Sequence, residues 1–214
     1  MTSKLDLEKS YENKKHKIRE RLLDFKKVWN KSNEEIFTEL CFCLLTPQTK
    51  ARAADMAIKY MVKNHILFSG NKTQIYKVLN CYGIRFPENK ANYILEAREF
   101  FKKNGKIDIK NKLENGSVFD KREWLVNTVK GFGLKEASHF LRNIGLDFDL
   151  AILDRHIIKN LLRYDVINEI PKSLTKKQYL MIEEKMKEFS KKIGIPLAEL
   201  DLLFWSEETR EIFK

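Results

Sequence analysis

Several features that are common in other protein classes are scarce or missing in this sequence of 214 residues. It has three cysteines, an odd number that gives no disulfide framework, and no cysteine follows Cys81, which excludes a C-terminal iron–sulfur cluster. No apolar run approaches the roughly 20 residues that a membrane span needs. The first residues, MTSKLDLEKSYENKK, lack the apolar core of a signal peptide. We therefore expect a soluble, cytoplasmic protein with no membrane contact.

A metal site is not indicated either. Cys41 and Cys43 stand two positions apart within ELCFCLLT, and on a helix they would point to different faces. We interpret them as buried apolar thiols. His139 and His156 have no metal-ligand partners at a recognisable spacing.

Positive charge, by contrast, is abundant. Lys and Arg number 41 against 30 Asp and Glu, which gives a formal net charge of +11. Such an excess favours a polyanionic partner, because contacts to phosphates release counterions. A lysine-rich genome or the charged surface of a thermophilic protein would give the same excess. The net charge alone therefore does not decide between nucleic-acid binding and these alternatives.

Helical periodicity dominates the chain, and strand signals are scarce. The sequence predicts an all-α fold of about ten helices with short connections, forming a single unit over residues 1–214 that consists of two packed helical lobes. The apolar character of the last residues predicts that the C-terminus is docked. Capping boxes, prolines and glycines mark the expected helix starts at Ser32, Pro87, Thr175 and Pro196, and the expected ends at Thr46, Gly83, Gly105 and Gly194.

The segment 118–145 is predicted to form two helices joined by a tight hairpin, Lys130-Gly131-Phe132-Gly133. Glycines at both hairpin positions allow a positive φ and let a phosphate approach the backbone. Gly133 ends where the next helix exposes free N–H groups, which suit a phosphate. We expect Lys130, Gly131, Gly133 and Arg155 to contact a DNA backbone without reading its sequence. A plain helix-turn-helix would give the same G-x-G pattern.

Lys135 and Asp154 make the pattern more specific. Lys135 follows the hairpin in the first turn of a helix, beside the positive end of the helix dipole, where its ammonium form is disfavoured. If it is also partly buried, a nucleophilic amine becomes available. Asp154 precedes RHIIKNLLRY and reads as the N-cap of that helix, which would hold its carboxylate ionised and aimed.

An amine nucleophile, an anion and a DNA clamp together indicate one reaction. The amine attacks the anomeric carbon of a nucleotide while the glycosidic bond breaks, and Asp154 stabilises the oxocarbenium-like charge on the sugar. A Schiff base with the opened sugar follows, and β-elimination then nicks the strand. Because the target carbon is hidden in a duplex, the nucleotide must first be flipped out.

These residues resemble those of the helix–hairpin–helix DNA glycosylases, the superfamily of endonuclease III and 8-oxoguanine DNA glycosylase. KGFGLKEA is similar to the family's hairpin and catalytic lysine, and LDRHI supplies an aspartate at the expected distance. The resemblance covers the chain from about Phe37 to the end. It implies a bifunctional DNA glycosylase and abasic-site lyase of base excision repair, with Lys135 as the nucleophile and Asp154 as the anion.

Within the superfamily the sequence looks like the archaeal-type 8-oxoguanine DNA glycosylase/lyase. It lacks the four clustered C-terminal cysteines usual in endonuclease III-like members and the β-rich N-terminal lobe of the larger eukaryotic-type enzymes. The resemblance implies that the C-terminal residue, Lys214, helps to distinguish 8-oxoguanine from guanine. The damaged base gains an N–H at its seventh ring position, and a site with an acceptor for it discriminates because an unmet polar group costs about 1–3 kcal/mol.

Three other side chains are candidates for contact with the flipped base or the gap it leaves. Gln48, in LLTPQTKA, resembles the glutamine that endonuclease III inserts into that gap, and a polar residue after a proline turn is an equal alternative. Phe86 and Trp205 could stack on a base, although aromatic residues in a helical protein more often pack in the core.

We expect a monomer whose partner is double-stranded DNA containing oxidised guanine, so that the protein would associate with the nucleoid. No redox or organic cofactor is expected; as in relatives, the main-chain carbonyls near Val129 and Phe132 would suit a monovalent cation. Two other functions remain open from the sequence. One is the same chemistry on oxidised pyrimidines, and the other is a non-catalytic hairpin protein that only binds DNA.

Overall fold

The computed structural model describes residues 4–146 and 148–214, which are mostly helical, so the expected all-α class is confirmed. The chain divides into two compact units. Met1–Lys27 and Gly145–Lys214 form one, here called the terminal unit, and Val28–Ile144 forms the other, the central unit.

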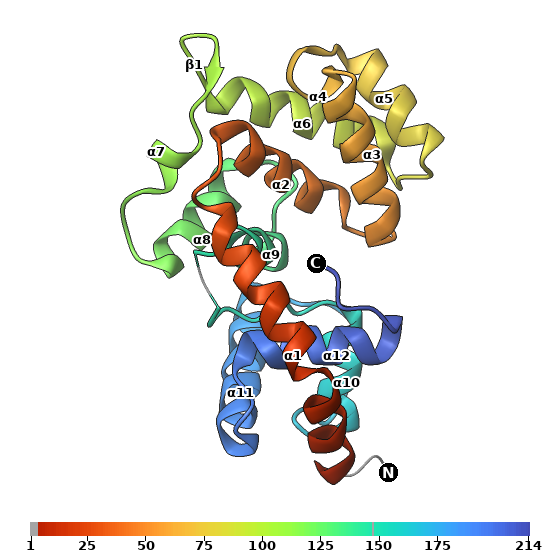
Figure 1. Ribbon diagram of the computed structural model, residues 1–214, viewed down its shortest axis with the longest axis vertical. Helices are drawn as coiled ribbons and strands as arrows, with labels where there is room; N and C mark the ends of the chain where they lie inside the picture. Colours follow the sequence, from red (N-terminus) through yellow and green to blue (C-terminus); the bar gives the residue numbers. More distant parts are fainter. Residues whose placement is uncertain (1–3, 147) are drawn as a thin grey trace. The chain divides into compact units, whose positions relative to one another are not determined.

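The elements of each unit follow the chain order labelled in Figure 1. The terminal unit contains α1 (Lys4–Val28, whose last residue begins the central unit), α10 (Arg155–Arg163), α11 (Lys176–Ile193) and α12 (Leu197–Thr209). The central unit contains α2 (Asn33–Leu45), α3 (Ala51–Lys63), α4 (Ile66–Ser69), α5 (Lys72–Cys81), α6 (Pro87–Phe101), β1 (Lys102–Lys103), β2 (Lys106–Ile107), α7 (Lys110–Leu113), α8 (Val118–Thr128) and α9 (Leu134–Asn143).

Local capping sets where several of these helices begin. The hydroxyl of Ser32 accepts a hydrogen bond from the amide of Glu35 at 3.2 Å, and the hydroxyl of Thr175 accepts one from the amide of Gln178 at 3.3 Å. Each pair also bonds in the reverse direction, which completes the capping box. Pro87 is the first residue of α6. The predicted starts of α2, α6 and α11 are confirmed.

The core of the central unit is built around α2, which packs against α3, α6 and α9. Its side chains from Leu40 to Leu45 are all buried, and the ring of Phe37 lies 6.3 Å from that of Phe101. Cys41 and Cys43 are buried thiols outside any disulfide, as predicted, and burial raises the pKa of Cys41 well above its usual value. These two thiols therefore act as small apolar core residues.

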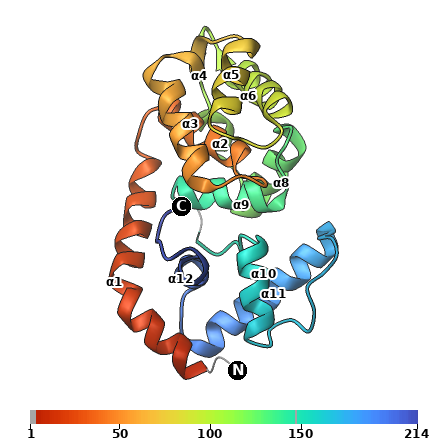
Figure 2. The same ribbon diagram turned by 90° about the vertical axis from the view of Figure 1, so that its right-hand side faces the viewer.

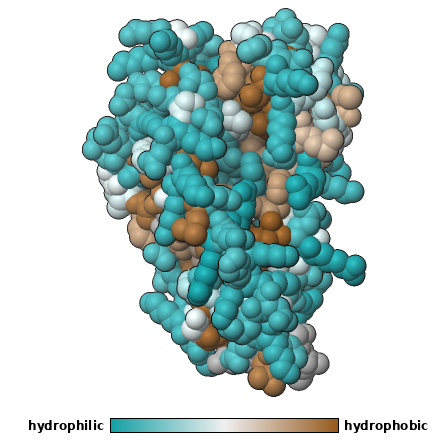
Figure 3. Space-filling model, viewed as in Figure 1, coloured by the Kyte–Doolittle hydropathy of each residue, from teal (hydrophilic) through white to brown (hydrophobic). Residues whose placement is uncertain are grey.

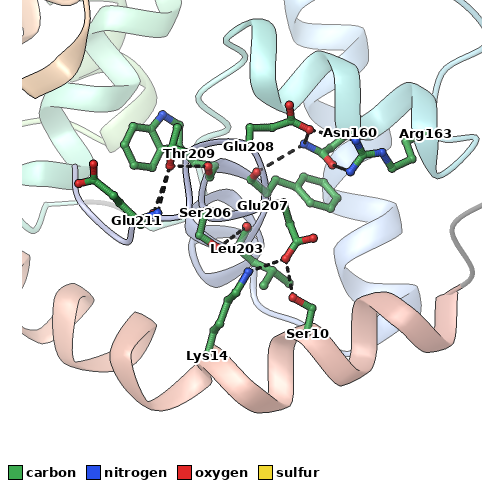
Figure 4. A network of polar contacts seen from close by, with 12 residues as sticks. Ser10, Lys14, Asn160, Arg163, Leu203, Ser206, Glu207, Glu208, Thr209 and Glu211 are labelled. Atoms are coloured by element: carbon green, nitrogen blue, oxygen red, sulfur yellow. Dashed lines mark hydrogen bonds and ion pairs between the residues drawn. The ribbon is translucent and has the colours of Figure 1, made fainter.

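In the terminal unit, α1 lies beside α12, as Figures 1 and 2 show. The buried hydroxyl of Tyr11 donates to Glu199 at 2.6 Å, and Arg19 pairs with the same carboxylate at 3.1 Å. The far end of α12 is held in the same way (Figure 4): Glu207 accepts from Lys14 of α1, and Glu208 pairs with Arg163 of α10. The first helix of the chain is thus bound to the last.

Three details differ from the sequence prediction, and the end of α12 adds one that was not predicted. The short helices α4 and α7 and the two-residue antiparallel pair β1–β2 were not expected. Gly105 does not end α6; the helix stops at Phe101, and Gly105 lies in the turn between β1 and β2. α12 ends at Thr209, so residues 211–214 extend beyond the helix without regular secondary structure.

Within the described ranges, the longest apolar stretches of helix are too short or too polar to cross a membrane. Figure 3 shows hydrophilic side chains over most of one face of the molecule, with smaller apolar areas among them.

Candidate active site

The hairpin between α8 and α9 contains one position that only glycine fits. Gly131 has φ of +93°, and a Cβ atom placed on it would lie 2.5 Å from the ring of Tyr93. Gly133 is different, because its φ of −109° is open to any residue. Of the two glycines that would allow a positive φ, only Gly131 adopts one.

Gly133 serves instead as the N-cap residue of α9. Its amide donates to the carboxylate of Glu136 at 3.1 Å. A phosphate bound at this amide, as the sequence suggested, would have to replace that bond. The sequence analysis missed Glu136, although a glutamate three residues after a cap position is a recognisable capping signal.

Lys135 is the second residue of α9, in the first turn as predicted, and its side chain is 20% exposed. Its Nζ donates to Thr46 Oγ1 at 3.3 Å and lies 3.2 Å from Glu136 Oε1. The amine is therefore held by one hydroxyl and one carboxylate while part of the side chain stays open to solvent.

Thr46 belongs to a turn, residues 46–50, that connects α2 to α3 and contains Gln48. Gln48 is exposed and has φ of +54°, which is uncommon for a residue other than glycine. Lys90 of α6 reaches this turn from the protein interior, with its Nζ 2.8 Å from the carbonyl of Pro47. Burial lowers the pKa of Lys90 to about 8; the nearby Lys135 lowers it too, whereas Glu136 raises it.

Asp154 is the N-cap of α10, as predicted. Its Oδ1 accepts hydrogen bonds from the amides of His156 and Ile157 at 2.8 and 2.9 Å. These two bonds from amides at a helix N-terminus hold the carboxylate in one orientation. The side chain is half-buried, so the carboxylate is fixed without being sealed off.

The segment before Asp154 is tied to α11 by two residues that the sequence did not reveal. The hydroxyl of Tyr179 donates to the carbonyl of Ala151 at 2.7 Å and accepts from the amide of Leu153 at 3.2 Å. The buried carboxylate of Glu183 accepts from the amide of Ala151 at 2.9 Å. These bonds fix the backbone up to the residue adjacent to Asp154.

The C-terminal segment lies against α1 in the terminal unit. Arg21 donates through Nε to the carbonyl of Phe213, and Thr209 bonds to both the amide and the carbonyl of Glu211. Lys214 is half-buried, and so is Trp205 on α12. A cleft of about 390 Å³ adjoins the segment, lined by Lys14, Lys17, Glu20, Arg21, Asp24, Ser206, Arg210, Glu211 and Ile212.

The remaining candidates lie at the surface. Phe86 is 51% exposed with φ of +54°, and the guanidinium of Arg85 lies 5.4 Å from its ring centre. Lys130 pairs with Glu96 at 3.1 Å, and Arg155 is exposed at the start of α10. The described residues contain no cluster of three or more His, Cys, Asp or Glu side chains suited to a metal ion. The carbonyl of Val129 accepts the amide of Phe132 at 3.0 Å.

Lys135 belongs to the central unit, whereas Asp154 and Lys214 belong to the terminal unit. Thr46, Gln48, Lys90 and Lys135 adjoin one another in the central unit through the bonds described above. In the terminal unit, Arg163 and Glu208 connect the helix that Asp154 caps to the helix that precedes the C-terminal segment.

Comparisons with known proteins agree on one family. The family model described as 8-oxoguanine DNA glycosylase matches residues 18–195. A protein of Fusobacterium nucleatum named 8-oxoguanine DNA glycosylase/AP lyase is 44% identical over 211 residues, which are 98% of this chain and 96% of that protein. A protein of Methanocaldococcus jannaschii with the same name is 42% identical over 197 residues, 92% of this chain and 91% of that protein.

Solved structures are similar over nearly the whole chain. The crystal structure of the 8-oxoguanine DNA glycosylase of Thermotoga maritima is 34% identical with a TM-score of 0.87, covering 99% of this chain and 98% of that one. The Methanocaldococcus jannaschii 8-oxoguanine glycosylase/lyase in complex with a 15mer DNA containing 8-oxoguanine is 37% identical with a TM-score of 0.87, covering 97% and 99%.

Proposed function

The chain belongs to the 8-oxoguanine DNA glycosylase family, and from that membership we propose that it removes 8-oxoguanine from double-stranded DNA and then cleaves the abasic strand. The observation that carries the proposal is the environment of Lys135. A half-buried amine in the first turn of a helix, bound by Thr46 and Glu136, suits a nucleophile better than a surface cation.

The first step forms a carbon–nitrogen bond. A neutral amine has two N–H bonds, and Thr46 and Glu136 together accept both, which leaves the lone pair of Lys135 Nζ free to attack. Glu136 also lies close enough to take the proton that the ammonium form must lose. Nζ attacks C1′ of the damaged nucleotide, and the bond from C1′ to the base breaks with its electron pair leaving on the base.

Asp154 stabilises the positive charge that develops on the sugar during this step. Both capping bonds of Asp154 end on Oδ1, and Oδ2 is then the atom that faces the charge. The caps hold the carboxylate in place before the reaction, so little reorganisation accompanies the change in charge.

The second step opens the sugar and cuts the strand. The nitrogen of Lys135 forms a Schiff base with C1′ as the ring oxygen leaves and takes a proton. Loss of a proton from C2′ then sends electrons toward the 3′ carbon, and the 3′ phosphate departs. Water finally hydrolyses the imine and restores the free amine.

We assign contacts with the flipped nucleotide, its neighbours and the gap it leaves to four side chains. Lys214 supplies contacts that distinguish 8-oxoguanine from guanine, Phe86 and Trp205 stack on bases, and Gln48 enters the gap in the duplex. Gln48 and Phe86 are exposed enough for this role.

The DNA backbone is held by Lys130, Gly131, Gly133 and Arg155, supported by the net charge of +11. The carbonyls near Val129 and Phe132 would bind a monovalent cation at the hairpin; the Val129 oxygen, which accepts one amide bond, keeps a second lone pair for it. No other cofactor is proposed. The protein acts as a monomer on DNA of the nucleoid in the cytoplasm.

The deciding experiment is borohydride trapping of the Schiff base. The protein is incubated with duplexes that carry 8-oxoguanine, guanine, thymine glycol or a plain abasic site. We expect a covalent product with the 8-oxoguanine and abasic duplexes that disappears in Lys135→Gln and persists in Lys130→Gln, which loses the same charge five residues earlier.

Three other outcomes of the trapping experiment would each indicate a different function or nucleophile. Trapping on thymine glycol but not on 8-oxoguanine would assign the protein to oxidised pyrimidines. Duplex binding without any trapped product would mean that the hairpin only binds DNA. A product that survives Lys135→Gln would mean that another amine is the nucleophile.

A further inference from the structure

Lys90 is a buried lysine with an unusual set of partners. It is 4% exposed, and lysine is almost never buried unless its charge is compensated. Its Nζ donates to the carbonyl of Leu45 at 2.9 Å, the carbonyl of Pro47 at 2.8 Å and the hydroxyl of Thr49 at 3.0 Å. An ammonium group has three protons, so these three acceptors use all of them.

The three acceptors all belong to the end of α2 and the turn that follows it. Leu45 is the last residue of α2, where carbonyls lack a partner within the helix and a positive charge is favoured. Pro47 and Thr49 stand on either side of Gln48, whose left-handed backbone is costly for a residue other than glycine. Lys90 therefore fixes the turn on both sides of its least favourable residue.

The same turn supplies the hydroxyl that contacts Lys135. Thr46 Oγ1 donates its own proton to the carbonyl of Cys43 at 2.9 Å, so it offers a lone pair to Nζ of Lys135 at 3.3 Å. The position of this hydroxyl depends on how the chain leaves α2. Lys90 thus holds the turn, and Thr46 of the same turn holds the amine of Lys135.

We propose that Lys90 is a positioning residue for the nucleophile: it fixes the turn of residues 46–50 so that Thr46 aims the amine of Lys135. The proposal rests on the proposed function, in which Lys135 forms the Schiff base. Lys90 itself does not touch the substrate, because its three bonds are made to the protein.

The test is single-turnover trapping with borohydride on a duplex that carries a plain abasic site, at saturating protein. Lys90→Met keeps the length of the side chain but removes its donors. We expect its trapping rate constant to fall by about 10- to 100-fold, the size of loss that a misplacement near 1 Å produces. Its affinity for a duplex with an uncleavable abasic analogue should stay within about threefold of the wild-type value, because the lost bonds lie within the protein.

Two controls make the result specific. Lys77→Met removes the same charge from an exposed position on α5 and should trap at the wild-type rate. Thr49→Val removes one acceptor of Lys90 and should slow trapping, whereas Thr49→Ser keeps the hydroxyl and should restore the rate. The Thr49 pair also decides the matter if Lys90→Met does not fold, which a thermal melt would reveal.

Two results would overturn the proposal. The first is trapping at the wild-type rate by Lys90→Met, or by Thr49→Val if Lys90→Met does not fold. The second is a slower rate that weaker DNA affinity alone explains. Lys135→Gln is measured in parallel. A trapped product in that variant would remove the proposed nucleophile itself, whereas a normal rate in Lys90→Met with no product in Lys135→Gln would leave the proposed function intact.

Discussion

The amine of Lys135 lies 3.2 Å from the carboxylate of the residue that follows it, Glu136. Neighbouring side chains on a helix normally point apart. These two meet because Glu136 turns back to the amide of Gly133 with its other oxygen. One carboxylate therefore holds both the hairpin and the proposed nucleophile.

Replacing Glu136 by Gln should slow trapping. Gln keeps an oxygen for the amide of Gly133 but cannot take the proton that the amine of Lys135 must lose. Because a positioned general base contributes on the order of 100-fold, we expect a fall of about that size in the trapping rate constant. Glu96→Gln, which removes the partner of Lys130, should leave the rate unchanged. A Glu136→Gln variant that traps at the wild-type rate would show that this carboxylate is not the proton acceptor.

Substitutions of Asp154 should distinguish the contribution of its helix cap to stability from the contribution of its charge to base release. Asn caps helices about as well as Asp, so Asp154→Asn should change stability by less than about 1 kcal/mol, whereas Asp154→Ala should cost roughly 1 kcal/mol more. Both should strongly slow base release from the 8-oxoguanine duplex. Thr175→Ala removes the cap of α11 at a similar cost in stability and should leave base release unchanged. If Asp154→Asn released the base at the wild-type rate, Asp154 would serve only as the N-cap of α10 and its charge would have no part in the reaction.

Removing the hydroxyl of Tyr179 should act on Asp154 from a distance. Tyr179→Phe leaves the buried carbonyl of Ala151 and the amide of Leu153 without this partner, which costs about 1–3 kcal/mol. We expect a lower thermal midpoint together with slower base release, since the backbone leading to Asp154 is loosened. Tyr76→Phe, at an exposed position on α5, should change neither. Unchanged base release in a destabilised Tyr179→Phe would show that the hydroxyl serves the fold alone.

The sequence predicted those parts of the site that depend on local rules. Lys135 follows the hairpin and Asp154 precedes a helix, and both places can be deduced from capping preferences within a few residues. The class of the fold follows in the same way from helical periodicity. Glu136 was predictable from its spacing to Gly133, and it was missed.

The partners of these residues could not be deduced in this way. Thr46 and Lys135 are far apart in the chain, and so are Lys90 and Leu45 or Tyr179 and Ala151. Such contacts depend on how helices pack, and no local pattern encodes them. The strained backbone at Gln48 is similar, because three bonds from Lys90 to its surroundings stabilise a conformation that its own sequence disfavours.

The hairpin should tolerate alanine at one glycine and not at the other. Gly131→Ala places a Cβ 2.5 Å from the ring of Tyr93 in a left-handed conformation, which alone costs roughly 1–2 kcal/mol. We expect it to lower stability and weaken binding of duplex DNA. In Gly133→Ala the nearest atom is the flexible end of Glu136 at 3.2 Å, so the loss should be below about 1 kcal/mol. Equal stability of the two variants in denaturant titrations would contradict this account.

Lys90 should leave a signature in the pH dependence of stability. Its pKa is about 8 in the folded protein and near 10.5 in the unfolded chain. Below pH 8 the buried ammonium form therefore lowers the stability of the folded state. This cost disappears as the pH rises from 8 to 10.5, where the unfolded chain binds more protons. Between pH 8 and 10.5 the free energy of unfolding of the wild type should therefore rise by on the order of 2–3 kcal/mol relative to that of Lys90→Met. Urea titrations at both pH values measure the difference, and parallel curves for the two proteins would rule it out.

The chain leaves the terminal unit at Lys27 and returns to it at Gly145, which lies against the backbone of Phe25 and Lys26. A Cβ on Gly145 would lie 2.6 Å from the backbone of both Phe25 and Lys26, in a left-handed conformation. The central unit is in this sense an insertion whose two ends emerge side by side. During synthesis it can fold while the C-terminal third is still being made, and its folding then brings α1 to the place where the later helices arrive. Once the central unit has folded, the loop that must close to join α1 to α10, α11 and α12 is therefore short, and its entropic cost is small.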